Sequence, residues 1–183
     1  MKYAIPIIFS FLFFTIKTDA QILKKPAQGK SLVYIMRSVD LAGAGLNFRI
    51  YDKDRFLGAL PSKAYFTYEC EPGEHLFWAA SENRDFVEAN LEANKTYVID
   101  AKSKVGLLIA AVGLEPYEPS NKRHAKRINR VLRKHVNAMV APIERTAEKE
   151  DNIKEALAAY DKIKDDKYSK ISKLLHNMNF ENE

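Results

Sequence analysis

The sequence predicts a mainly β fold, an antiparallel β-sandwich of about eight strands followed by a C-terminal α-helical extension. Between about residues 30 and 117, short apolar runs recur every 8 to 13 residues with turn residues between them, a pattern typical of sandwiches and barrels. From Pro119 onward the apolar period becomes helical. The 183 residues are 46% hydrophobic and 29% charged with a single Cys, which excludes a disordered or disulfide-stapled chain.

The first two predicted strands differ in pattern. Residues 31–37 are apolar on both faces and rich in β-branched and aromatic side chains, which predicts a central strand. Residues 46–51 alternate, so one face should point to the core and the other to solvent. The expected core face holds Leu46, Phe48 and Ile50, and the expected solvent face holds Asn47, Arg49 and Tyr51.

Turn residues separate the remaining strands. Asp52-Lys53-Asp54 and Asn94-Lys95 should close hairpins, and Pro72-Gly73 fits the central positions of a β-turn. The strands predicted between these turns cover residues 55–60, 64–70, 75–80, 86–91, 96–101 and 105–114. Cys70 falls on one of them, and we expect it to be a buried core residue rather than half of an intermolecular disulfide.

The extension begins with a predicted amphipathic helix over residues 120–140, capped by Ser120 and ended before Pro142. Its apolar stripe comprises His124, Ala125, Ile128, Val131, Leu132, His135, Val136 and Met139. The opposite side carries seven basic residues without an acidic one: Lys122, Arg123, Lys126, Arg127, Arg130, Arg133 and Lys134.

A second helix is predicted from apolar residues spaced three and four apart: Ile153, Ala156, Leu157, Tyr160 and Ile163. Ile171, Leu174 and Leu175 should extend it or form a short third helix. Residues 21–118 hold 12 basic and 13 acidic side chains, whereas residues 119–183 hold 15 and 10, so the basic excess lies in the extension.

Two interpretations of the seven basic residues stay open. A helix docked on the sandwich must present polar residues to water, and Lys and Arg are good helix formers. Alternatively, like charges without acidic partners indicate an anionic partner, such as lipid head groups, lipopolysaccharide phosphates or acidic glycans. No nucleic acid is expected, because the extension lacks interleaved aromatic residues. The helix also lacks an aromatic anchor, which favours docking over membrane insertion.

Residues 1–20 have the pattern of a cleaved secretory signal, with an apolar run followed by small residues. The mature chain would start at Gln21, with a sandwich domain over residues 21–118 and the helical extension over 119–183. We therefore expect an exported protein, periplasmic or secreted. It should not be a lipoprotein, since Gln21 rather than a Cys follows the signal.

Short motifs in the β region resemble the bacterial domain of unknown function 2846 family over about residues 30–117. They are Tyr34 with Arg37, Ala42-Gly43, Asn47-Phe48 with Tyr51, Leu57-Gly58, Tyr65-Phe66, residues 72–75 and residues 91–97. The resemblance implies an exported or lipoprotein envelope protein with a β-sandwich and no established activity. Asn94 replaces the family's usual turn glycine, and the helical extension lies outside the resemblance.

No pattern in the chain predicts an enzyme, a cofactor or a metal site. His124 and His135 share a helix face, but eleven residues of helix separate them by about 16 Å, too far for one metal ion. Glycine-rich phosphate loops and nucleophile elbows are also absent from the sequence. We therefore expect a non-enzymatic binding or scaffolding module of the bacterial envelope, with its partner unidentified. The alternative is a peripheral binder of anionic lipid or acidic glycan through the basic helix.

Overall fold

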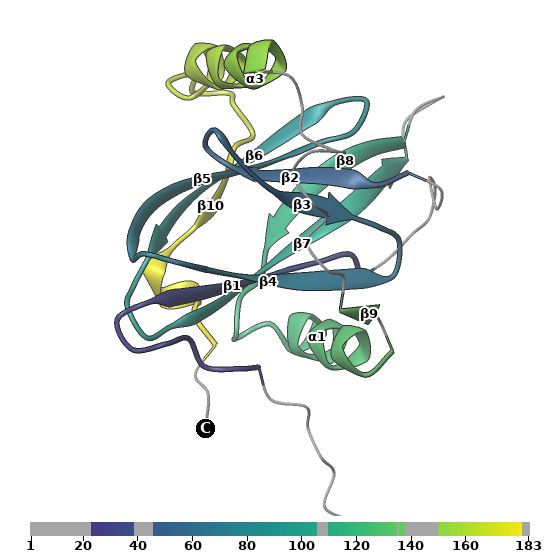
Figure 1. Cartoon of the computed structure of the whole chain (residues 1–183), viewed down its shortest axis with the longest axis vertical. Coiled ribbons are helices and arrows are strands. Elements are labelled where there is room, and N and C mark those ends of the chain that lie inside the picture. Colours follow the sequence, from purple (N-terminus) through teal and green to yellow (C-terminus); the bar gives the residue numbers. More distant parts are fainter. Residues whose placement is uncertain (1–22, 39–45, 106–109, 135, 138–149, 181–183) are drawn as a thin grey trace, which may run out of the picture.

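Two five-stranded sheets face each other in the computed structural model, which describes residues 23–38, 46–105, 110–134, 136–137 and 150–180 (Figure 1). The first sheet has the order β8 (Ala110–Pro116), β7 (Thr96–Val105), β1 (Ser31–Met36), β4 (Ala64–Cys70), β9 (Val136–Asn137). The second has the order β10 (Ser172–Leu174), β6 (Arg84–Leu91), β5 (Gly73–Ala80), β2 (Phe48–Asp52), β3 (Arg55–Leu60). The predicted mainly β sandwich is confirmed.

The sheets are mixed rather than purely antiparallel. Neighbours joined by short turns, such as β2 with β3 and β5 with β6, pair antiparallel as expected. Three pairs are parallel: β1 with β7, β4 with β9 and β10 with β6. Parallel neighbours require a long connection, and the chain between β1 and β7 supplies it by passing through the second sheet. β1 lies at the centre of its sheet, as predicted.

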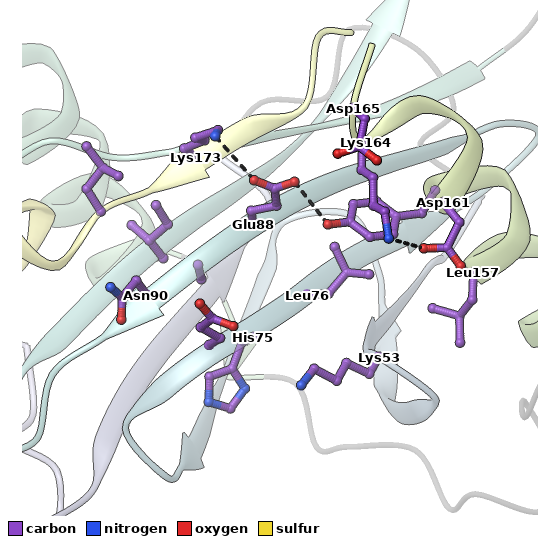
Figure 2. Close-up of a pocket in the computed structure, with 15 residues that line it drawn as sticks. Lys53, His75, Leu76, Glu88, Asn90, Leu157, Asp161, Lys164, Asp165 and Lys173 are labelled. Atoms are coloured by element: carbon purple, nitrogen blue, oxygen red, sulfur yellow. Dashed lines mark hydrogen bonds and ion pairs between the residues drawn. The ribbon is translucent and has the colours of Figure 1, made fainter.

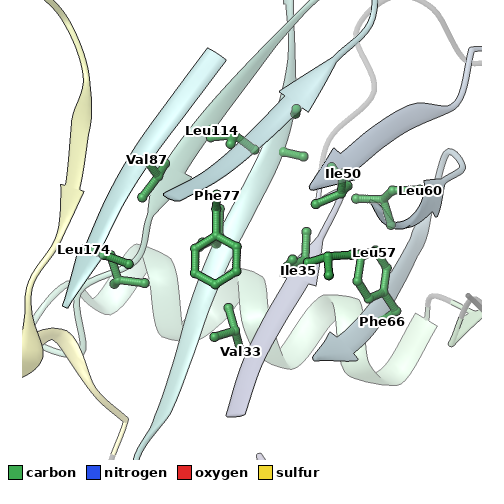
Figure 3. Packing of buried hydrophobic residues seen from close by; sticks show 14 of the residues in the cluster. Val33, Ile35, Ile50, Leu57, Leu60, Phe66, Phe77, Val87, Leu114 and Leu174 are labelled. Atoms are coloured by element: carbon green, nitrogen blue, oxygen red, sulfur yellow. The ribbon is translucent and has the colours of Figure 1, made fainter. Parts of the chain in front are cut away.

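The main core fills the space between the sheets (Figure 3). Alternate residues of each strand point into it, including Val33 and Ile35 from β1 and Phe77 from β5. Cys70 is buried in this core with 8% of its surface exposed, so its predicted burial is confirmed. Leu174, from the C-terminal extension, is fully buried in the same core.

The hairpin predicted at Asp52-Lys53-Asp54 forms between β2 and β3. The hairpin predicted at Asn94-Lys95 is wrong, because β6 and β7 lie in different sheets, and one predicted strand is displaced. Lys53 and Asn94 adopt left-handed backbone conformations with φ of 51° and 62°, and Gly73 has φ of 117°, as tight turns require. The strand predicted over residues 105–114 is wrong at its start, because Val105 ends β7 and β8 begins at Ala110. Residues 106–109 lie outside the described ranges.

The face of β2 predicted to meet solvent is partly covered by α3 (Glu150–Ile163), the second predicted helix. Tyr51 is fully buried there, and its ring stacks on Trp78 with centroids 3.9 Å apart. Ala156 of α3 packs against this aromatic cluster with no exposed surface. The solvent-facing prediction for Tyr51 is wrong, because alternation within one strand carries no information about a helix that folds back over it.

The first helix is shorter than predicted. α1 spans Lys122–Lys134 rather than residues 120–140. Asn121, not Ser120, caps it, since the Asn121 side-chain oxygen accepts the Arg123 backbone N–H at 3.0 Å. Val136 and Asn137 form β9 beside β4 instead of continuing the helix. His135, Met139 and Pro142, together with the signal-like residues 1–20, lie outside the described residues.

The predicted helical continuation at Ile171, Leu174 and Leu175 is wrong. Residues 172–174 form β10, which pairs with β6, and a short 3₁₀ helix, η1, follows over His176–Met178. Leu174 is fully buried whereas Leu175 is 48% exposed, the alternation of a strand. The extension therefore supplies a strand to the sandwich. Within the described ranges, no helix is both long and apolar enough to cross a membrane.

Candidate anion-binding face

The α1 helix lies against the outer face of the first sheet, at the opposite end of the molecule from α3 (Figure 1). Its buried residues are Ile128, Val131 and Leu132, together with His124. They pack on Val98 and on other apolar side chains of that face. The apolar stripe is thus used in docking the helix onto the sandwich, and the basic side is turned away from the sheet.

Six of the seven predicted anion-binding residues are exposed on this outward side. They are Lys122, Arg123, Lys126, Arg130, Arg133 and Lys134. The Arg133 Nε donates to the Asn129 backbone oxygen at 3.2 Å, within the helix. Across the described part of the chain, none of the six forms an ion pair with a carboxylate. Their mutual repulsion is therefore not relieved by nearby described residues.

Arg127, the seventh residue, belongs to a different environment. Its side chain is 35% exposed, and its guanidinium lies 3.9 Å from the Glu115 carboxylate. A hydrogen bond to Tyr117 raises the pKa of the Arg127 guanidinium. Arg127 therefore helps to fix the helix to the sheet, and we separate it from the six exposed residues, which we call the basic face.

A buried polar network lies beneath the N-terminal half of α1. The Asp100 carboxylate has no exposed surface, and it accepts hydrogen bonds from the Ser38 backbone N–H at 2.9 Å and the Tyr117 hydroxyl at 2.5 Å. The Ser38 hydroxyl also donates to Asp100, at 2.5 Å. Burial, followed by the nearby Asp100 charge, raises the pKa of Tyr117. The raised pKa keeps the Tyr117 hydroxyl protonated, so it remains a hydrogen-bond donor to Asp100.

The imidazole of His124 packs beside this network and is neutral there. Its imidazole stacks on Tyr117 with centroids 4.1 Å apart, and Nδ1 accepts the Glu118 backbone N–H at 2.9 Å. Burial, and then the positive charge of Lys102, lowers the pKa of His124. A lowered pKa favours the neutral ring that can accept this hydrogen bond.

Two lysines that the sequence did not single out lie in the N-terminal segment, on the same sheet face as α1. Leu23 is buried in the same apolar cluster as Ile128 and Val131, which places the N-terminal segment next to α1. The Lys24 backbone is held on both sides, since its N–H donates to Tyr34 and its oxygen accepts from Thr96, each at 2.9 Å. The Lys24 and Lys25 side chains are exposed. The apolar residues of this segment show neither strand nor helix spacing, so the sequence could not predict its position next to α1.

Metal ligation finds no support in the described parts of the chain, where no three or more His, Cys, Asp or Glu side chains gather closely enough to hold an ion. Among the described histidines, His75 and His124 are engaged in hydrogen bonds with neighbouring residues. The chemistry offered by the basic face is that of several exposed ammonium and guanidinium donors on one rigid helix.

The chain is similar to an uncharacterized protein of Haemophilus influenzae, with 28% identity over 113 residues. The aligned part covers 60% of this chain and 66% of that relative, just under two thirds of its length. No protein-family model matches the chain, and no solved structure is significantly similar to it. The resemblance to the domain of unknown function 2846 family stays a prediction.

Proposed function

We propose that the protein is an exported, non-enzymatic binding module of the bacterial cell envelope whose basic face binds an anionic envelope component. The observation that carries this proposal is the docking of α1. The helix buries its apolar stripe on the sandwich and leaves six basic side chains exposed, without ion pairs to described carboxylates. A face of this kind attracts phosphate or carboxylate groups arrayed on a surface.

The strength of such binding follows from simple electrostatics. A basic side chain close to an acidic lipid surface contributes roughly 1 kcal/mol, so several acting together suffice for peripheral attachment. The attraction is screened over a Debye length of about 8 Å at physiological salt. Binding through the basic face should therefore weaken steeply as salt is added. Lys24 and Lys25 lie at the same end of the molecule and would add to the attraction.

The signal-like residues 1–20 support the envelope as the location, because they would direct the chain out of the cytoplasm. Exported proteins meet lipid head groups, lipopolysaccharide phosphates and acidic glycans rather than nucleic acid. The alternative use of the same module is as a scaffold for an envelope protein. The rigid sandwich, with helices packed on both of its outer faces, supports that use as well.

The experiment is sedimentation of the chain from Gln21 onward with phosphatidylcholine vesicles that contain or lack phosphatidylglycerol. We expect sedimentation only with the acidic vesicles and release by salt. The variant carries Lys126→Glu, Arg130→Glu and Lys134→Glu, and it should lose most binding because it reverses half of the basic face. Arg127 is left intact because it pairs with Glu115 and supports packing.

The matched control carries Lys154→Glu, Lys162→Glu and Lys167→Glu, which change the net charge equally at exposed positions on and after α3. It should bind acidic vesicles nearly as well as the unmodified protein. Equal loss in both variants would show that net charge alone drives sedimentation. Unchanged binding by the α1 variant would show that the basic face is a solvent-exposed helix surface that does not bind the vesicles.

A further inference from the structure

A groove of about 710 Å³ opens between α3 and the outer face of the second sheet (Figure 2). Its walls come from β5, β6 and β10 on one side and from the C-terminal half of α3 on the other. The volume falls in the range of small-ligand and peptide sites. The groove exists because α3 covers only the part of this face around Trp78 and Phe86, and leaves the rest open.

The apolar part of the lining is aliphatic. Leu76 lies on the sheet side, Leu157 on the helix, and Leu175, 48% exposed, at the β10 end. The aromatic ring in the groove, Tyr160, packs against Phe86 with centroids 5.6 Å apart. Its hydroxyl donates to Glu88 at 2.9 Å, and burial followed by this bond raises the pKa of Tyr160 to about 12. The ring is thus fixed in the wall rather than offered as a stacking platform.

Several charges in the groove are already matched within the protein. The Lys173 ammonium lies 3.5 Å from the Glu88 carboxylate, and the Lys164 ammonium donates to Asp161 at 2.8 Å (Figure 2). His75 is paired with Asp52. These pairs hold the walls of the groove in place. Because their charges are already matched within the protein, they contribute to the shape of the groove rather than to ligand binding.

Four other polar residues of the lining are exposed, and none makes an ion pair or side-chain hydrogen bond with another described residue. They are Lys53, Glu74, Asn90 and Asp165. Asn90 lies on β6 and Lys53 in the turn between β2 and β3, with His75 between their side chains in the view of Figure 2. Together they offer a cationic donor, two carboxylate acceptors, and an amide that can donate and accept at once.

We propose that this groove binds a short extended peptide segment of a partner protein. An amide such as that of Asn90 pairs with both the N–H and the C=O of a peptide backbone. The leucines accept an aliphatic side chain, and charges of both signs at the rim match acidic and basic side chains of the segment. A glycan fits less well, because the leucines give it no flat aromatic face on which to stack.

The inference rests on the protein being a binding module, and it gives that module a second site. The groove borders α3 and the basic face belongs to α1. These two helices lie at opposite ends of the molecule (Figure 1). A peptide and an anionic surface can therefore be bound at the same time. The two sites can also be tested separately, because they share no residue.

The probe is the pentapeptide Lys-Leu-Ala-Leu-Asp, titrated into ¹⁵N-labelled protein while amide shifts are followed by NMR. We expect saturable shifts centred on Leu76, Asn90 and Tyr160. Each of Lys53→Glu and Asn90→Ala should weaken binding about tenfold, the effect of losing one hydrogen bond to a charged or buried group. The control Lys126→Glu, on the basic face, should bind the peptide unchanged.

The two proposals fail in distinguishable ways. Lys53→Glu should leave sedimentation with acidic vesicles intact, whereas reversal of the basic face should remove it without affecting the peptide. Absence of saturable shifts in folded protein would overturn the peptide site. Shifts at the same residues with tri-N-acetylglucosamine but not with the peptide would also overturn it, in favour of a glycan site.

Discussion

The His75 imidazole, on β5, bridges β2 and the turn that precedes β5. Nδ1 lies 2.7 Å from the Asp52 carboxylate, and Nε2 lies 2.9 Å from the Glu71 backbone oxygen. Both ring nitrogens thus face acceptors, which only the doubly protonated ring can satisfy. The Asp52 hydrogen bond, with a further contribution from Cys70, raises the pKa of His75 to about 10. The ring is therefore a cation at neutral pH.

This contact gives a pH-dependent prediction. Because the pKa of His75 is raised in the folded state, its stabilisation is complete below about pH 6.5 and is lost as pH rises from there to about 10. His75→Gln should lower the free energy of unfolding by about 1.5–3 kcal/mol at pH 6. Urea denaturation should show this difference shrinking toward pH 10. A difference independent of pH would contradict the charged assignment.

The pKa of His124 is lowered in the folded state, whereas that of His75 is raised. A lowered pKa means that the unfolded chain takes up the proton first, so His124 costs stability as pH falls below about 6.5. Protonation would also remove the acceptor for the Glu118 N–H and place a third positive charge beside Lys102 and Arg127. The wild-type protein should accordingly lose stability on both sides of neutrality, through two different histidines.

At the scale of secondary-structure elements, β10 joins the extension to the sandwich. Leu174→Ala should lower the free energy of unfolding by about 2–5 kcal/mol, because the leucine is fully buried in the main core. Its neighbour supplies the control, since Leu175→Ala removes a side chain that is 48% exposed and should cost less than about 0.5 kcal/mol. Thermal or urea denaturation measures both. Equal effects would mean that β10 does not pack as described.

The strands were predictable from sequence to the extent that local patterns determine them. Lys53 closes the β2–β3 hairpin as predicted, and alternation indicates that Phe48 and Ile50 of β2 point inward. The turns at Gly73 and Asn94 instead carry the chain from one sheet to the other, which no local pattern reveals. β10 was not predictable, because a segment of three residues is too short for its apolar spacing to distinguish a strand from a turn of helix. Its pairing with β6 is also set by contacts about 85 residues apart in the chain.

The two candidate sites also differ in how far the sequence predicts them. The basic face follows from helical spacing alone, since residues at three- and four-residue intervals share a side of α1. The inward position of Arg127 depends on Glu115 and Tyr117 of the sandwich, which no spacing rule reveals. The groove needs α3 to fold over β5 and β6, so its residues come from five separate parts of the sequence.

At the scale of the whole molecule, the two helices give the sandwich two different ends. α1 covers the outer face of one sheet and turns basic side chains outward, whereas α3 covers part of the other and borders the groove (Figure 1). Attachment through α1 would leave the groove facing away from the surface. This polarity is the arrangement expected of a module that joins an anionic surface to a protein partner.

The most direct test of this account is a fluorescence measurement of which end meets the surface. An environment-sensitive dye is attached at Lys126→Cys on α1 or at Lys162→Cys on α3, both exposed positions; Cys70 is buried and is replaced by Ser as a precaution. We predict that acidic vesicles shift the emission of the α1 label and leave the α3 label unchanged. An equal response at both positions, or a response at α3 alone, would contradict the account.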